Sequence, residues 1–433
     1  MFQGSGNIPP ILAIARRLVT RGHHVRIIAG PGLQPDQPPR PVTVRFLDEI
    51  KTAGATHVPF QQTYDPFGCA PLRRGLIGGW TPKKFAVHQF EARRILAAPL
   101  WAQNVSNELR RHAADVVVSD YFLFGALAAA EAAICPAVAL VHTIYSRPIA
   151  GVPPYGPGLL PGRGLRSSVR DAIDRALIRQ VHRREGLPPL NRARLDLGLK
   201  PVRSVFLQYD RAARVLIMTS AAFDFTRSSL PSNVRYTGMP FEEEHGVWKP
   251  PWPTDDGRPL VLVSFSTAPQ GQATVLRRTL DALGPLNVRA VVTLGPALMD
   301  NEFRAPINVV LVPFVPHALI LPHVDVVVSQ CGHGTVLKAL TYGVPLVCIP
   351  LRGDQPDIAA RVVHADAGVA LSPTASVFEL RTAIERVLSD SSFRDAAERM
   401  ATILRSEDGV QTAVAEIENV AAESAVSHFH EGA

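Results

Sequence analysis

The spacing of apolar and polar positions predicts alternating helices and strands along the first half of the chain. Residues 8–22 carry an apolar stripe at helical spacing, with prolines at the start and a glycine at the end, which is typical of a helix. Residues 24–30 follow as a strand. The apolar runs 114–120 and 137–142 are predicted as strands with an alanine-rich helix between them. Continuous apolar strands joined by helices indicate a parallel sheet covered on both faces.

The same alternation resumes in the second half. Apolar runs there are predicted as strands at residues 260–267, 288–295, 308–315, 324–330 and 344–350. In the middle, residues 148–205 mix loops with an arginine-rich helix, and residues 228–259 are rich in proline, which opposes regular structure. We therefore predict an α/β protein with two facing Rossmann-like domains. The N-terminal domain covers 1–227, a linker covers 228–259, and the C-terminal domain with its C-terminal helices covers 260–433.

Composition narrows the class of protein without changing the fold prediction. The chain has 433 residues, 46% hydrophobic and 19% charged, which is typical of a folded protein large enough for two cores. Its formal charge of +7 is compatible with an anionic partner. The basic residues are scattered, however, and form no dense run or zinc-finger spacing. We therefore do not expect nucleic-acid binding as the main function.

Cysteine spacing and hydropathy favour a cytoplasmic location. The cysteines lie far apart without a CxxC pair, which fits a reducing compartment, and Cys331 and Cys348 are interpreted as small buried apolar residues. The most apolar region, 114–141, is interrupted by charged residues and a proline, so we expect peripheral membrane contact at most. No basic segment followed by an apolar one marks a signal peptide.

A strand, a glycine-containing turn and a helix follow one another over residues 324–343. The turn reads CGHGT and contains Gly332, His333, Gly334 and Thr335. Glycines let backbone N–H groups approach a ligand, and a helix N-terminus carries about half a positive charge, which suits a diphosphate. A tight turn without a ligand explains the motif equally well. The next strand leads to Asp354-Gln355, whose carboxylate and amide suit the hydroxyls of a sugar.

From residue 314 onward the chain resembles the donor-binding region of nucleotide-sugar glycosyltransferases of the GT-B fold. It is most similar to the bacterial natural-product branch, with its macrolide and antibiotic glycosyltransferases, and distantly to the UDP-glycosyltransferases. FVPH at 314–317 resembles the W-x-P-Q motif whose aromatic ring stacks on the base, and the motif around CGHGT matches nearly position by position. VSFST at 263–267 resembles the diphosphate-binding segment, and 4–25 resemble the opening loop and helix of the acceptor domain.

The resemblance implies a donor-binding set that reaches from the base to the hexose: Ser266, Thr267, Phe314, Val315, Gln330, Gly332, His333, Gly334, Thr335, Asp354 and Gln355. Several members have simpler interpretations. Phe314 is otherwise a core aromatic, and His333 is otherwise a turn residue that reaches solvent. No Asp-x-Asp triplet occurs, so we expect no divalent ion in the reaction and no cofactor beyond the nucleotide sugar.

The sequence departs from the family pattern at three points. Asn7 stands where the family has its catalytic histidine, and asparagine cannot accept a proton at neutral pH. Gln330 stands where the family has a phosphate-binding histidine, so the charge is lost. The strand that normally precedes the opening loop is not in the sequence. We expect either that the N-terminal sheet lacks one member or that the start is misassigned.

The resemblance implies direct displacement at the anomeric carbon with inversion, and three residues are candidates around the acceptor hydroxyl. Asp120 ends its strand and aligns with the family aspartate that orients the histidine; otherwise it caps the edge of the core. His142 ends the next strand and is either a base or an ordinary histidine of the pocket wall. Asn7 either positions the acceptor or caps the helix that follows it.

We predict a glycosyltransferase that moves a hexose from a UDP- or dTDP-sugar to a hydroxyl of an apolar small molecule. One alternative is a non-catalytic GT-B helper protein that binds nucleotide sugar, which the replacements at Asn7 and Gln330 would suit. Another is a sugar-nucleotide epimerase, but its acid/base carboxylate pattern is not found in the second half. The sequence does not determine the sugar, the nucleobase of the donor, the acceptor or the oligomeric state.

Overall fold

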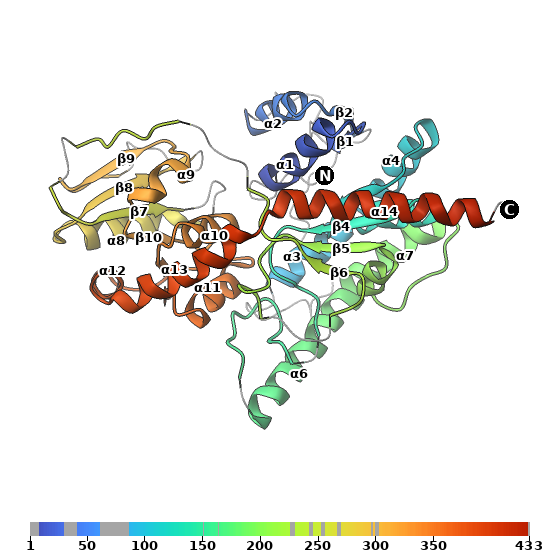
Figure 1. The fold of residues 1–433 in the computed structure, drawn as a ribbon. Helices are drawn as coiled ribbons and strands as arrows, with labels where there is room; N and C mark the ends of the chain where they lie inside the picture. Colours follow the sequence, from blue (N-terminus) through green and yellow to red (C-terminus); the bar gives the residue numbers. More distant parts are fainter. Residues whose placement is uncertain are drawn as a thin grey trace.

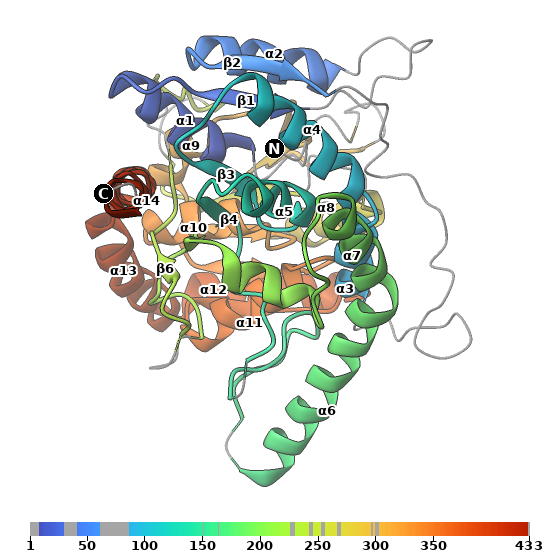
Figure 2. The ribbon, with the colours of Figure 1, turned by 90° about the vertical axis from the view of Figure 1, so that its right-hand side faces the viewer.

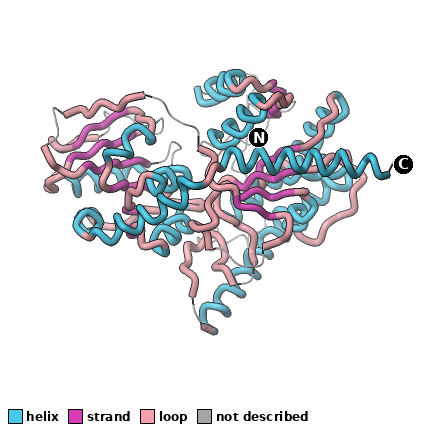
Figure 3. Tube along the Cα trace, viewed as in Figure 1, coloured by secondary structure: helices cyan, strands magenta, loops and turns pink. Residues whose placement is uncertain are grey.

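The computed structural model describes residues 8–29, 41–60, 86–149, 151–162, 164–225, 230–241, 246–252, 256–265, 270–295, 298 and 303–431. Within these residues the strands are arranged in three parallel sheets with helices packed around them (Figure 3). The C-terminal sheet has six strands, in the order β12-β11-β10-β7-β8-β9. The N-terminal half has a four-stranded sheet, β3-β4-β5-β6, and a separate pair, β1-β2. An α/β protein with parallel sheets is therefore confirmed.

The C-terminal sheet is covered on both faces because its strands carry apolar residues at successive positions. In β10 (Val326–Ser329), Val327 packs with α10 (His333–Thr341), α11 (Gln355–His364) and α13 (Ser391–Ser406). Its neighbours Val326 and Val328 pack on the opposite face with α8 (Gln272–Leu283) and α12 (Val377–Ser389). The other strands are β7 Leu260–Ser264, β8 Arg289–Thr293, β9 Val309–Val312, β11 Leu346–Cys348 and β12 Gly368–Ala370.

The four-stranded N-terminal sheet is also buried on both faces. Ala139 and Val141 of β4 (Ala137–Val141) face a core formed with α4 (Ala98–Arg111), α5 (Phe124–Ala132) and α7 (Leu187–Asp196). Val138 and Leu140 face α1 (Ile8–Thr20) and α14 (Gly409–Glu431). The remaining strands of this half are β1 Arg26–Ala29, β2 Thr56–Pro59, β3 Val117–Asp120, β5 Arg214–Ile217 and β6 Val234–Tyr236.

Two elements differ from the predicted division of the chain. Strand β6 lies inside the proline-rich segment predicted as a linker, yet it pairs with β5 at the edge of the N-terminal sheet. Helix α14, assigned by the sequence to the C-terminal domain, runs back along the N-terminal sheet (Figure 1). Its acidic side chain Glu418 accepts hydrogen bonds from Arg21 at 2.7 and 2.9 Å. The boundaries at 227 and 260 stay a proposal.

A long helix, α6 (Leu165–Val181), projects from the N-terminal half (Figure 2). It continues into a π-helical turn, η2 (His182–Gly186), before α7 begins. The other helices are α2 Pro41–Thr52, α3 Ala86–Ile95, the 3₁₀ turn η3 Val205–Arg211, α9 His317–Ile320 and the 3₁₀ turn η6 Leu321–His323. Among the described residues, no helix combines the length and the apolar content that crossing a bilayer requires.

Candidate functional site

The turn between β10 and α10 presents backbone N–H groups at the carboxyl end of the C-terminal sheet. Cys331 adopts a φ of 66°, a left-handed conformation that reverses the chain directly after the strand. Gly332 is the N-cap of α10 and provides no side-chain cap for the first N–H groups of the helix. These groups therefore face outward with the positive end of the helix dipole behind them, as an anion site requires.

Packing does not explain why the two glycines of this turn lack side chains. A Cβ atom on Gly334 would have its nearest described neighbour at 3.9 Å, the methyl group of Met239. On Gly332 it would meet only the Gln330 side-chain nitrogen, at 3.4 Å. Both are tolerable contacts within the described residues. The bare backbone leaves room in front of the helix instead.

Buried polar atoms around this turn lack partners within the described residues. Gln330 is 6% exposed and its Oε1 accepts no hydrogen bond, while both ring nitrogens of His333 are buried and unbonded. Burial lowers the pKa of His333 to about 3, with a smaller contribution from His142. The imidazole is therefore neutral and offers one donor and one acceptor. Such groups cost free energy unless something satisfies them, and a ligand at this turn would do so.

Asp354 and Gln355 differ from each other in how much of their hydrogen-bonding capacity is already used. Asp354 Oδ2 accepts a hydrogen bond from Thr143 Oγ1 at 2.7 Å, and burial raises the pKa of this carboxyl group against the opposing effects of Thr143 and His142. Gln355 Oε1 accepts from the N–H groups of Leu351 and Arg352 at 2.8 and 2.9 Å. Its Nε2 donates to Gln270 at 2.8 Å. Contrary to expectation, the Gln355 amide is mainly committed to holding the loop.

The other predicted donor residues divide into those the structure places and those outside the described residues. Phe314 is 65% exposed, so the alternative of a core aromatic is wrong, and its ring is available for stacking. Val315 is buried in the core of the C-terminal half. Thr335, in the first turn of α10, is partly buried. Ser266 and Thr267 lie outside the described residues, as does Asn7.

Asp120 and His142 meet at the carboxyl edge of the N-terminal sheet. Strands β3 and β4 are parallel neighbours with Asp120 opposite Leu140, so the residue two positions beyond Leu140 lies beside the carboxylate. His142 Nδ1 lies 3.0 Å from Asp120 Oδ1, with side-chain exposures of 19% and 0% respectively. The rings of Tyr121 and Phe122 meet the imidazole edge-on at 5.3 and 5.4 Å. The carboxylate thereby fixes which ring nitrogen carries the proton.

The Asp120–His142 pair and the donor residues around the glycine turn lie next to each other where the two halves of the molecule meet. Thr143 follows His142 directly and bonds Asp354, and His142 is near enough to lower the pKa of His333. Thr143 was not predicted as a site residue, although it directly follows a predicted strand end. A second link, Asp224 to Arg361 at 2.6 Å with both side chains at most 4% exposed, had no local sequence signal.

The chain is similar to several known proteins. Residues 277–420 match the family described as erythromycin biosynthesis protein CIII-like, C-terminal domain. A curated relative, the 4'-demethylrebeccamycin synthase of Lentzea aerocolonigenes, is 29% identical over 96% of this chain and 97% of its own length. The crystal structure of CalG4, the calicheamicin glycosyltransferase, superposes with a TM-score of 0.72 at 22% identity and covers 96% of both chains. That of VinC in complex with dTDP gives 0.67 at 20% identity over 96% and 98%.

The fold shared with these structures is GT-B. Residues 277–420 match the EryCIII-like C-terminal domain, and over nearly its whole length the chain is similar to GT-B glycosyltransferases of the natural-product type. The resemblance inferred from the glycine turn and the N-terminal loop is thereby confirmed. The roles of the individual residues stay proposals.

Proposed function

We propose that the chain transfers a hexose from a UDP- or dTDP-sugar to a hydroxyl group of an apolar natural product, with inversion at the anomeric carbon. The observation that carries the proposal is the hydrogen bond between His142 and Asp120 beside the Thr143–Asp354 contact. In the proposed mechanism this contact would set a base with an orienting carboxylate next to the glycine turn. The names of the relatives, a rebeccamycin-type synthase and a transferase holding dTDP, support the substrate classes.

In this mechanism His142 takes the proton of the acceptor hydroxyl. Because Nδ1 faces the Asp120 carboxylate and carries the hydrogen, the lone pair lies on Nε2, which has no hydrogen bond within the described residues. Asp120 then stabilises the imidazolium that forms as the oxygen attacks. Asn7, at the family's usual position for the base, would only hold the acceptor.

The glycine turn would stabilise the departing nucleoside diphosphate. Negative charge grows on the leaving phosphate as the glycosidic bond breaks, and the uncapped N–H groups at the start of α10 would donate to it. Preorganised donors of this kind are worth about 3–4 kcal/mol each in comparable oxyanion sites. Thr335 and the Gln330 amide would add side-chain contacts. Asp354 would offer its second oxygen, Oδ1, to a hydroxyl of the hexose.

The helper-protein alternative rests on the loss of the two family histidines. The Asp120–His142 pair weakens it, because such a pair is what proton transfer from an acceptor hydroxyl would use. The family and the named relatives also favour an enzyme.

The test compares acceptors that differ in acidity. After mass spectrometry has identified a transferable donor among UDP- and dTDP-glucose, transfer to 2-phenylethanol and to 4-nitrophenol is measured for the wild type, His142→Ala and Asp120→Asn. A missing general base typically costs about 10²–10⁴-fold. We expect that loss with the alcohol, and a much smaller loss with the phenol, which is largely ionised at pH 8 without help.

Binding of dTDP or UDP by calorimetry serves as the control, because neither variant changes a residue of the glycine turn itself. An equal loss with both acceptors would assign His142 a structural role rather than a proton transfer. Unchanged transfer to the alcohol would remove it from the mechanism. The anomeric configuration of the product, read by NMR, separately tests inversion.

A further inference from the structure

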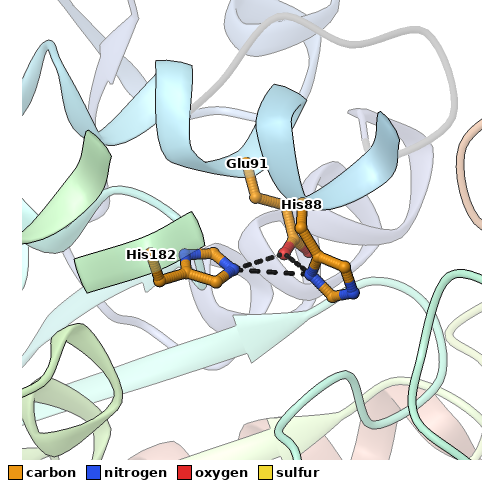
Figure 4. Close-up of side chains that lie close together, drawn as sticks. All are labelled: His88, Glu91 and His182. Carbon is orange, nitrogen blue, oxygen red and sulfur yellow. Dashed lines mark hydrogen bonds and ion pairs between the residues drawn. The ribbon is translucent and has the colours of Figure 1, made fainter. Parts of the chain in front are cut away.

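A buried cluster of His88, Glu91 and His182 lies in the N-terminal half, apart from the elements that form the proposed donor site. His88 and Glu91 are one turn apart on α3, and His182 begins the π-helical turn η2 (Figure 4). Their side chains are 1%, 9% and 4% exposed. Single π-turns within helices frequently mark functional positions, because they re-aim a side chain at a cost to the helix.

The three side chains converge on one point. His88 Nδ1 lies 3.3 Å from Glu91 Oε2 and 3.4 Å from His182 Nε2, and the third side of the triangle, from His182 Nε2 to Glu91 Oε2, is 3.5 Å. In a tetrahedral Zn²⁺ site with bonds of about 2.0–2.1 Å, neighbouring ligand atoms are separated by roughly 3.3–3.4 Å. The triangle therefore has the size of one face of such a tetrahedron.

Neighbouring groups hold the ligands in this arrangement. His88 Nε2 lies 2.6 Å from the carbonyl oxygen of Tyr155, so it carries the proton and leaves the Nδ1 lone pair facing the cluster. Tyr121 donates its hydroxyl to Glu91 Oε1 at 3.3 Å, on the oxygen that faces away from the triangle. A backbone carbonyl on the second nitrogen of a histidine and a donor on the carboxylate are the usual outer contacts of protein zinc ligands.

We propose that His88 Nδ1, Glu91 Oε2 and His182 Nε2 bind a Zn²⁺ ion, with a water molecule in the fourth position. The ion ties α3 to the junction of α6 and α7 and, through His88, to the loop at Tyr155. It is a structural site and takes no part in binding the diphosphate. The sequence shows no sign of this site because His182 lies about ninety residues after His88 and Glu91, and the three form no recognisable motif.

The alternative is a triad joined by hydrogen bonds alone, with His182 Nε2–H shared between Glu91 and His88. That arrangement leaves Nδ1 of His182 buried and without a partner within the described residues, as the metal site also does. The two therefore differ only in whether the triangle holds a proton or a cation. Metal analysis distinguishes them directly.

The experiment uses full-length protein purified without a histidine tag. We expect stoichiometric Zn²⁺ by mass spectrometry of the digested protein, a lower Tm after EDTA treatment, and recovery on adding Zn²⁺. Substituting Co²⁺ should give the strong visible bands of a tetrahedral ion. Glu91→Gln and His182→Gln should weaken Zn²⁺ binding by more than about 100-fold, because losing an outer contact alone costs 10–100-fold.

His112→Gln is the matched control, since this histidine is exposed and outside the cluster, and it should keep its zinc. If the wild type retains no Zn²⁺ and its Tm does not respond to the ion, the triad is hydrogen-bonded and the proposal is wrong. It is also wrong if either cluster variant binds Zn²⁺ as tightly as the control. The wild-type measurements decide the question even if a variant fails to fold, and none of them depends on the proposed transfer reaction.

Discussion

The proposed proton transfer depends on the position of the His142 imidazole. Because parallel neighbours β3 and β4 end at the same edge, a histidine two residues past Leu140 reaches the carboxylate of Asp120 at 3.0 Å. An aspartate that serves a histidine on the opening loop in the family can therefore serve one on the adjacent strand here. In the proposed mechanism the base, His142, follows strand β4 instead of lying on the opening loop, whereas the orienting aspartate, Asp120, keeps the family's position.

Gly334 offers a test of the donor site that separates binding from folding. Its Cβ position is clear of described atoms to 3.9 Å, so Gly334→Ala and Gly334→Val should leave the Tm of the ligand-free protein nearly unchanged. The added methyl groups would fill the space in front of α10, where the proposed diphosphate lies. We expect at least a tenfold loss of dTDP or UDP affinity for valine, about 1.4 kcal/mol, and a smaller loss for alanine, measured by calorimetry.

A drop in Tm that parallels the loss of affinity would show instead that the turn is simply packed. Unchanged affinity for valine would place the nucleotide elsewhere.

Residue chemistry at this junction was only partly predictable from the sequence. Asp120 and His142 were found because each ends an apolar run, and strand ends of parallel sheets gather at one edge. Thr143, Asp224 and Arg361 were missed because their partners are far along the chain, and a single sequence carries no signal of such pairs. The commitment of the Gln355 amide to Leu351 and Arg352 also depends on loop geometry that residue type does not reveal.

At the scale of elements, α11 and the loop before α6 form a tight contact between the halves. Gly158 has a φ of 67°, and a Cβ atom there would lie 2.7–2.9 Å from atoms of Pro356, so only glycine fits. The N–H groups of Gly156 and Gly158 donate to the two oxygens of Asp357 at 2.8 and 3.3 Å. A buried carboxylate thus fastens the loop to the helix.

This carboxylate predicts a pH dependence of stability. Burial raises the pKa of Asp357 to about 7, although Arg361 and the two glycine N–H groups oppose the shift. The folded protein therefore holds the proton more tightly than the unfolded chain, where the pKa is about 3.9. The stabilising contribution is complete below about pH 4 and is lost as the pH rises through 7. Asp357→Asn, which keeps a neutral side chain, should escape that loss.

We expect the free energy of unfolding of Asp357→Asn to improve relative to the wild type between pH 4.5 and 8, by at most about 4 kcal/mol at 1.36 kcal/mol per pKa unit. Urea denaturation at several pH values measures the difference. Asp281→Asn, at an exposed position on α8, is the control and should show a flat profile. If the difference in unfolding free energy between Asp357→Asn and the wild type also stays constant with pH, the carboxyl group is ionised at all these pH values.

Elements were predictable where the apolar pattern was long and continuous. The runs that became β1, β3, β4, β7, β8, β9, β10 and β11 all follow this rule, as does α1 with its terminal prolines and glycine. Strand β6 was missed because three residues within a proline-rich stretch are too few to show alternation. It forms because β5 offers an open edge, which is a tertiary rather than a local cause.

At the scale of the whole molecule, the last helix, α14, packs on the N-terminal half although it follows the C-terminal half in the sequence. This helix leaves the C-terminal half and runs along the N-terminal sheet (Figure 1). There it packs on α1 and the sheet, and Ile417 and Val414 join Val138 and Leu140 in one apolar cluster. Periodicity identified neither the destination of this helix nor its partners, because an apolar stripe fits any complementary face. Chain order alone therefore assigned it to the C-terminal domain.

Because of this packing, we expect α14 to stabilise the N-terminal half. The variant Ile417→Ala tests this expectation. The side chain is 5% exposed, and truncating a buried isoleucine to alanine typically costs about 2–5 kcal/mol. If the helix stabilises the N-terminal half, the loss should be local. Hydrogen exchange read by mass spectrometry should then become faster in peptides covering α1, β4 and β5, and stay unchanged in peptides covering β8 and α12. Asn419→Ala, on the exposed face of the same helix, should change neither region. Faster exchange confined to the C-terminal sheet would instead show that α14 is energetically part of that half, and the predicted boundary at residue 260 would then describe the molecule better than the packing does.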